Sequence, residues 1–200
     1  IAQDLTRAGY FIATGGGPGI MEAANLGAFL AEISEEDLEG ALTTLSHAPV
    51  YTDEGYMQCA QEVLDMFRHG RSSLAVPTWF YGHEPSNLFS VHIAKYFSNS
   101  LREDGLLAIA LHGIMFAPGS AGTTQEVFQD ATQNHYETYG VVSPMVFLGR
   151  EHYGENTLIY DCLSRQAEGK GYEDYLCLTE SEEETVAFIT SHPPRELVRV

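Results

Sequence analysis

Two glycine-rich segments constrain the fold of this 200-residue chain more than any other feature of its sequence. Each follows a short apolar run that is typical of a buried strand, and each leads into a segment with the apolar spacing of a helix. The first is TGGGPGIMEAAN at residues 14–25, and the second is FAPGSAGTTQE at residues 116–126. Such strand–loop–helix junctions are typical of open α/β sheets, whose ligands bind beyond the carboxyl ends of the strands.

The rest of the chain repeats this alternation of short apolar runs and helical spacing. The pattern predicts strands over residues 10–14, 73–80, 113–117, 144–148 and 175–178. It predicts helices over residues 1–8, 20–32, 34–45, 56–68, 89–111, 123–136, 157–167 and 181–189. We therefore expect an α/β fold, with one doubly wound, Rossmann-like parallel sheet in a single domain over residues 1–200. Because the chain begins inside a helix, we expect the first strand of the sheet to be missing from it.

Single residues add detail to the structure predicted for three of these segments. Ser34, followed by Asp37, is typical of a helix N-cap. Pro77 has no backbone N–H, so the apolar run around it is expected to form an edge or irregular strand. Gly105 marks a position at which the long helix around it can break.

The charge of the chain excludes several classes of partner. It carries 10 Lys and Arg against 28 Asp and Glu, a formal charge of −18. Such a field repels duplex nucleic acid and anionic membranes, so we expect neither as a partner. The longest apolar stretch, residues 105–118, is interrupted by His112 and is too short to cross a bilayer. The three cysteines have no close pairing, which indicates free thiols in a reducing cytoplasm.

Cations gather in one part of this acidic chain. Arg68, Arg71, Lys95 and Arg102 fall in a segment whose only acid is Glu84. They can form an anion site, or they can balance neighbouring acidic helices. The sequence leaves both interpretations open.

Both glycine segments have the chemistry of anion-binding loops. Glycine lets the backbone approach a ligand closely, and the free amides at a helix start attract anions. In the first loop, however, Pro18 at the first helical position after a simple tight turn explains the pattern as well. In the second, Thr123 and Glu126 also fit a capping box, in which the Glu side chain returns to the cap amide.

Better-known nucleotide and hydrolase motifs do not fit. The dinucleotide spacing G-x-G-x-x-G fails because Ile20 and Glu22 stand where the last glycine is needed. The only Gly-Lys pair, at residues 169–170, is far from either loop, so no phosphate loop of the Walker type is present. The order Gly119-Ser120 also differs from the G-x-S-x-G nucleophile elbow.

The pair of loops resembles the Lonely Guy (LOG) family, whose members carry a first motif close to GGGPGIMEAAN and a second written P-G-G-x-G-T-x-x-E. The resemblance covers nearly the whole chain and implies hydrolysis of the N-glycosidic bond of a nucleoside 5′-monophosphate of purine or cytokinin type. The products are a free base and ribose 5-phosphate. It also implies a homodimer or larger homo-oligomer, with no cofactor and no metal.

The family's catalytic residues match Glu126 and, on the preceding helix, Arg102. The chain departs from the family at Ser120, which replaces a glycine, and at Arg102, which lies in NSLRED instead of an M-H-x-R-K run. In this reading Glu126 stabilises the ribose cation and orients water, while Arg102 fixes the phosphate or assists the departing base. The residues expected to bind the substrate are Gly15, Gly16, Gly17, Gly19, Gly119, Ser120, Ala121, Gly122, Thr123 and Thr124.

Two other readings remain open. One is a molybdenum-cofactor carrier protein, because such carriers are similar in fold and bind their ligand without catalysis. The other is a structural domain whose site is inactive. His83, His92 and His112 are interpreted as structural histidines. Trp79, Phe80 and Tyr81 can stack on a base, although ordinary core packing is the preferred interpretation.

Overall fold

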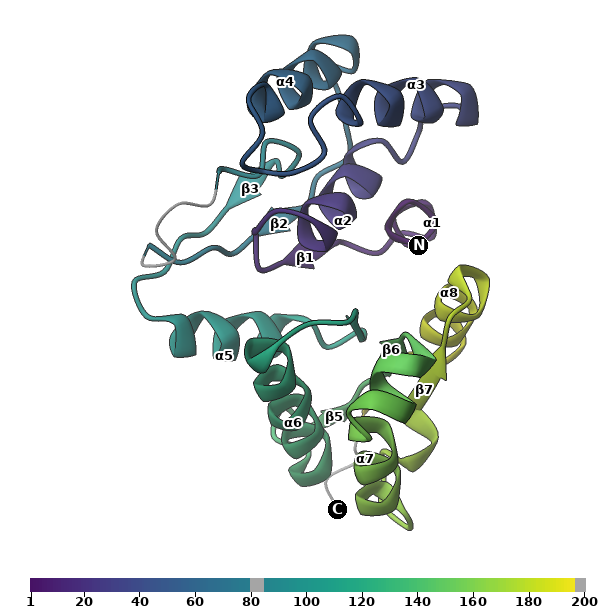
Figure 1. The fold of residues 1–200 in the computed structure, drawn as a ribbon. Coiled ribbons are helices and arrows are strands. Elements are labelled where there is room, and N and C mark those ends of the chain that lie inside the picture. The colour runs from purple at the N-terminus through teal and green to yellow at the C-terminus, as the bar shows by residue number, and fades with distance from the viewer. Residues whose placement is uncertain (80–84, 197–200) are drawn as a thin grey trace. The chain divides into compact units, whose positions relative to one another are not determined.

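The computed structural model describes residues 1–79 and 85–196. The chain forms two compact units, Ile1–Leu106 and Leu107–Val200, and we describe each by itself. Each contains a parallel three-stranded sheet with helices, so the predicted α/β class is confirmed (Figure 1). The single domain and the single doubly wound sheet stay predictions.

The first unit is built on a sheet in the order β1-β2-β3, whose strands are Ala13–Thr14, Leu74–Ala75 and His92–Ile93. Both pairings are parallel. Its helices are α1 (Ala2–Arg7), α2 (Ile20–Phe29), α3 (Glu35–Leu45) and α4 (Tyr56–Met66), and α5 (Asn99–Ile109) runs past its last residue. Its core consists of Leu26, Phe29, Leu30, Ala41, Ala60, Val63 and Phe89. The predicted cap is confirmed, because Ser34 Oγ accepts from the Asp37 amide at 3.1 Å.

One expectation for the first unit is confirmed in part and another is wrong. β2 is the central strand and not an edge, but the run around Pro77 is irregular, as the alternative expectation had it, because it pairs only at Leu74–Ala75 and at an isolated bridge from Thr78 to Tyr96. Residues 89–111 are not one helix. The amide of His92 instead donates to Ser73 O at 3.0 Å and forms β3, and α5 begins only at Asn99. Gly105 lies inside α5 and does not break it.

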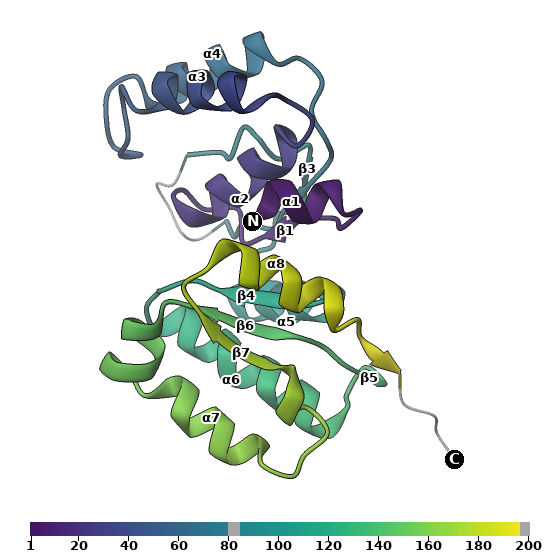
Figure 2. The ribbon, with the colours of Figure 1, turned by 90° about the vertical axis from the view of Figure 1, so that its right-hand side faces the viewer.

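The second unit has a parallel sheet in the order β4-β6-β7, formed by Ile114–Phe116, Met145–Leu148 and Leu176–Thr179. A separate antiparallel pair joins β5 (Val141–Val142) to β8 (Arg195–Glu196). Its helices are α6 (Ala121–Tyr136), the π-helix η1 (Glu151–Asn156), α7 (Ile159–Ala167), the 3-10 turn η2 (Glu173–Tyr175) and α8 (Glu182–Ser191). Figure 2 shows α6 and α7 on one face of the sheet and α8 on the other.

The core of this unit lies between the sheet and α6 and α7. It consists of Phe116, Val127, Ala131, Met145, Phe147, Tyr153, Ile159 and Leu163. The strands and α7 agree with the sequence to within a few residues, whereas η1 and the β5–β8 pair were not predicted. Within the part of the chain that the structure describes, we find no helix that is long and apolar enough to span a bilayer.

Candidate functional site

The first glycine loop follows β1 and lies against the end of β2. Gly16 has a φ of +77°, and a Cβ built on it would lie 3.0 Å from Pro77 Cδ and 3.1 Å from Ala75 Cβ. Both its backbone conformation and its surroundings therefore require glycine. The close approach places the loop at the carboxyl end of the sheet, where ligands of α/β proteins bind.

Arg102, the predicted catalytic cation, lies beside this loop. A Cβ on Gly15 would lie 3.0 Å from Arg102 Nη1 and 2.9 Å from Met21 Sδ. Arg102 Nη2 donates to Asn99 Oδ1 at 2.8 Å, one turn earlier on α5. The structure thus brings together two predicted site residues, Gly15 and Arg102, within the first unit.

A buried network of polar side chains is hydrogen-bonded to the same loop. Asn25 is fully buried in α2 and accepts from Thr14 Oγ1 at 2.6 Å and from Asn87 Nδ2 at 2.9 Å. Its own amide donates to Ser73 Oγ at 2.8 Å. Thr14 Oγ1 in turn accepts from the Gly16 amide at 3.1 Å. That amide is therefore already hydrogen-bonded within the protein and is not a donor to a ligand. The contribution of Gly16 is that it lets the loop pack closely against the end of β2.

The helix after the first loop begins where its apolar spacing predicted. α2 starts at Ile20 with Gly19 as its N-cap, at a φ of +78°, so the interpretation of Pro18 as the first helical residue is wrong. The positive φ explains why glycine stands at position 19. Gly17 is buried, whereas Gly19 is exposed.

In the second loop the helix begins earlier than expected. α6 starts at Ala121 with Ser120 as its N-cap, so Thr123 is the third helical residue and the predicted capping box is wrong. A Cβ on Gly119 would overlap with the Thr123 side chain, which packs back on the loop. The cap explanation of Glu126 is thereby removed, because Glu126 lies in the second turn, where it is half-buried.

The start of α6 offers amide donors to an anion. The Thr124 amide donates to Ser120 O at 3.1 Å, while the amides of the preceding helical residues face out of the helix start. Gly119, Ser120, Ala121 and Gly122 are all exposed. An exposed helix start with small residues is a site at which a phosphate can be bound by backbone amides.

The predicted site residues fall into two groups. The first loop and Arg102 lie in Ile1–Leu106, and the second loop and Glu126 lie in Leu107–Val200. Among the described residues, no cluster of three or more His, Cys, Asp or Glu side chains has an arrangement that can hold a metal ion.

The cationic side chains of residues 66–102 make different kinds of contact. Arg71 pairs with Glu32 at 3.6 Å, which is the charge-balancing role. The Lys95 ammonium lies 4.3 Å from the centre of the Trp79 ring, in a cation–π contact. Of these side chains, Arg102 is the one placed against a glycine loop.

The predicted core packing of Trp79 is wrong. Its side chain is 54% exposed and stacks on Phe97, with ring centres 5.9 Å apart. Phe80, Tyr81 and His83 lie outside the described residues. His92 and His112 are both exposed, and the His92 ring lies 6.4 Å from that of Phe11.

The structure adds buried polar residues that the sequence did not indicate. Tyr153 of η1 is 1% exposed, and its pKa is raised to about 12, first by burial and then by the charge of Glu126. Asp130 of α6 is 3% exposed, and burial raises its pKa to about 7. Burial also raises the pKa of Glu22, whose carboxylate accepts from the Tyr56 hydroxyl. Tyrosines and single acids have no motif of their own, so only tertiary contacts reveal them.

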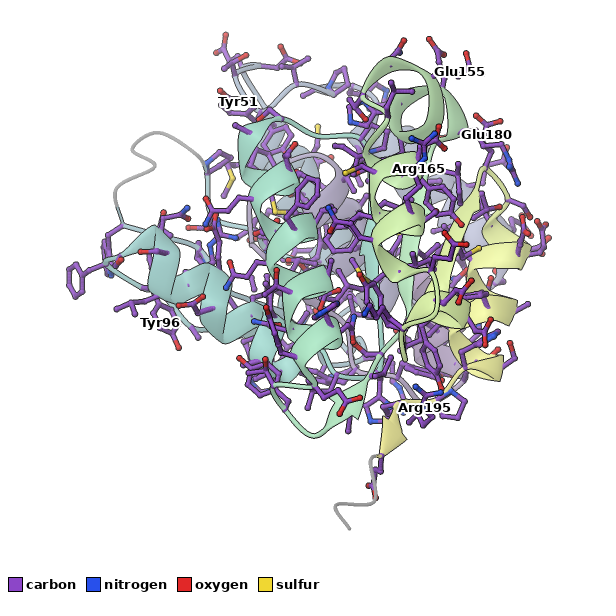
Figure 3. All side chains as sticks on the ribbon, turned by 90° about the horizontal axis from the view of Figure 1, so that it is seen from below. Tyr51, Tyr96, Glu155, Arg165, Glu180 and Arg195 are labelled. Carbon is purple, nitrogen blue, oxygen red and sulfur yellow. The ribbon has the colours of Figure 1, made fainter. Side chains whose placement is uncertain are left out.

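A shallow hollow of about 240 Å³ lies elsewhere in the second unit. Its lining comes from α6, α7 and the following turn: Phe128, Ala131, Thr132, His135, Tyr136, Gln166 and Tyr172. None of these residues belongs to the predicted site. Figure 3 shows the side chains of both helices, with Arg165 marking α7.

Comparison with known protein families finds no family model that matches this chain, and comparison with curated proteins finds no significant match.

Proposed function

We propose that this protein hydrolyses the N-glycosidic bond of a nucleoside 5′-monophosphate of purine or cytokinin type, as enzymes of the Lonely Guy family do. The proposal includes membership of that family, a Rossmann-like doubly wound fold and a homo-oligomeric, cytoplasmic enzyme. The observation that carries it is the position of the Arg102 guanidinium, 3.0 Å from where a Cβ on Gly15 would lie, because it supports the pairing of the family's cation with its first glycine loop.

The second loop supplies the phosphate-binding part of the proposal. The start of α6 is exposed and carries the small residues Gly119, Ser120, Ala121 and Gly122. Backbone amides at a helix start favour a doubly charged 5′-phosphate through both hydrogen bonds and the helix dipole. The Thr123 and Thr124 hydroxyls lie in the first turn of the same helix.

Glu126 supplies the charge that the reaction needs. When the bond between base and ribose breaks, its electrons leave with the base and positive charge develops on the ribose ring. A carboxylate beside the ring stabilises this charge and can take a proton from the water that adds to the anomeric carbon. The base receives a proton, and ribose 5-phosphate is left.

Release of adenine from AMP by Glu126→Gln tests the proposal most directly. Gln keeps the size of the side chain and removes its charge, so turnover should fall roughly 100-fold or more while nucleotide affinity and melting temperature stay nearly unchanged. Glu180→Gln is the control, because it makes the same charge change at an exposed position of the same unit (Figure 3).

Two results would contradict the proposal. Equal turnover by Glu126→Gln and Glu180→Gln would remove Glu126 from the reaction. Binding of AMP without any release of adenine by the unmodified protein would instead favour a nucleotide or molybdenum-cofactor carrier. Sedimentation of the protein tests the homo-oligomer.

A further inference from the structure

Tyr153 contacts the second glycine loop from an element that the proposed reaction does not use. It belongs to η1, which follows β6, and its side chain is 1% exposed. Its hydroxyl donates to Ala117 O at 2.7 Å. Ala117 joins the end of β4 to Pro118, so this bond lies at the point where the chain leaves the sheet and enters the loop.

The same turn touches the loop at a second point. Gly149, the first residue after β6, has a φ of +125°, and a Cβ built on it would lie 3.1 Å from Pro118 Cγ. Strand pairing explains why the two segments meet, because Phe116 of β4 is opposite Phe147 of β6. Both contacts therefore hold the first two residues of the loop at the carboxyl end of the sheet.

The ring of Tyr153 is itself fixed by packing. It meets the Phe147 ring edge to face, with centres 5.2 Å apart and planes at 74°. The His152 ring lies at 4.7 Å and 88° on its own turn. A buried ring held in this way presents its hydroxyl at a defined position, so the Ala117 carbonyl has a fixed partner.

The charge of Glu126 also acts on Tyr153. Burial and this charge together hold the pKa of the phenol at about 12, so the hydroxyl remains a donor throughout the neutral range. The interaction connects Tyr153 to the residue that carries charge in the proposed reaction. Tyr153 thus interacts both with the loop entrance, through its hydrogen bond to Ala117 O, and with the charge of Glu126 in the second turn of α6.

We propose that Tyr153 is a positioning residue that fixes the entrance of the second glycine loop so that the amides at the start of α6 are held for an anion. The inference rests on the proposed function for the identity of that anion, the 5′-phosphate. Fixing the Ala117 carbonyl fixes the direction in which the chain leaves β4. An error of about 1 Å in the position of binding groups can cost roughly 100-fold in rate, so such support has a measurable effect.

Tyr153→Phe tests the role, because it removes the hydroxyl and keeps the ring. Tyr160→Phe is the matched control: the Tyr160 ring also meets Phe147 edge to face, at 5.5 Å, and its hydroxyl lies 3.5 Å from Leu176 O. We expect Tyr153→Phe to raise amide hydrogen exchange in residues 117–124 roughly tenfold and to weaken ribose 5-phosphate binding, measured by calorimetry, by a similar factor. Tyr160→Phe should change both by less than about twofold.

Equal exchange in the two variants would overturn the inference and leave Tyr153 as a core residue. Should Tyr153→Phe fail to fold, Gly149→Ala tests the same support, because the added Cβ displaces Pro118; unchanged exchange in residues 117–124 would then overturn it. If the unmodified protein neither binds ribose 5-phosphate nor releases adenine from AMP, the proposed function fails. The exchange measurement still decides the role of Tyr153 in that case.

Discussion

The two glycine loops are held in place by different means, although each follows a parallel strand and opens a helix. Under the first loop lies a network of four buried polar side chains centred on Asn25. The second unit also buries an asparagine, Asn134, but places it at the far end of α6, where it accepts from the Ser143 amide at 2.9 Å. The entrance of the second loop is instead held by Tyr153 and by close packing of Gly149.

This difference bears on how each loop can be perturbed. The first loop depends on groups that also join β1, α2 and β2, so loosening it costs global stability. The second loop is exposed and is held at its entrance by one hydroxyl and one close contact. Loss of either contact should therefore change the position of the loop with little effect on the stability of the fold.

The two units also differ in what they bury without a hydrogen-bond partner. Within residues 1–79 and 85–196, the unpartnered buried atoms include Thr78 Oγ1 in the first unit and Asp130 Oδ2 in the second. A hydroxyl is neutral at every pH, whereas a carboxyl becomes charged. Asp130 should therefore give the second unit a pH dependence of stability that Thr78 cannot give the first.

The largest expected effect comes from Asp130→Asn. The pKa of Asp130 is about 7 in the folded protein, against an ordinary value of 3.8 that applies to the unfolded chain. Between these two pH values the folded state therefore binds more protons than the unfolded state. The contribution of Asp130 to the free energy of unfolding is consequently greatest below about pH 4 and is lost as the pH rises through 7. Asp130→Asn should match the unmodified protein near pH 4 and be more stable at pH 8, by at most about 4 kcal/mol.

Urea unfolding across this pH range measures the difference. Asp161→Asn, which removes a carboxylate at an exposed position on α7, is the control for the loss of a carboxyl group that is not buried. Parallel curves for Asp130→Asn and the unmodified protein would show that Asp130 is charged, and paired, in the folded state.

A smaller effect is expected from removing the buried amide under the first loop. Asn25→Ala removes one hydrogen-bond partner from each of Thr14, Ser73 and Asn87, and it should lower the free energy of unfolding by about 3 kcal/mol. Asn134→Ala should cost a similar amount, because its Oδ1 and Nδ2 both bond to the backbone of Ser143.

Hydrogen exchange at Gly16 distinguishes the two asparagines. Its amide donates to Thr14 Oγ1, which the Asn25 network holds, so exchange should rise in Asn25→Ala and not in Asn134→Ala. Equal protection of Gly16 in both variants would mean that the network stabilises the unit without positioning the loop.

Local signals explain what the sequence could predict. The cap at Ser34 was found because a short polar side chain before an apolar run bonds the amide three residues later, and this bond is present. The strands β4, β6 and β7 were found because they are buried and apolar. These features depend on residues that are close in the sequence.

What the sequence did not predict depends on partners far along the chain. β3 exists because its two residues bond to β2, and neither its length nor its composition distinguishes it from the helix expected there. The role of Tyr153 depends on the pairing of β4 with β6, which brings η1 to Ala117. The helix after the second loop begins at Ala121 although Ser120 makes no side-chain cap bond, so no capping signal marked its start.

The smallest expected effect has the opposite sign from that of Asn25→Ala. Thr78 is 8% exposed, and in the described part of the chain its hydroxyl has no partner, so burying it costs free energy without return. Valine has the same shape without the hydroxyl, and Thr78→Val should raise the free energy of unfolding by about 1 kcal/mol.

Thr6→Val is the matched control, because the Thr6 hydroxyl is also buried but donates to Ala2 O at 2.7 Å, so this variant should gain nothing or lose stability. Urea unfolding of both variants measures the difference, and a loss of stability in Thr78→Val equal to that in Thr6→Val would show that Thr78 has a partner in solution.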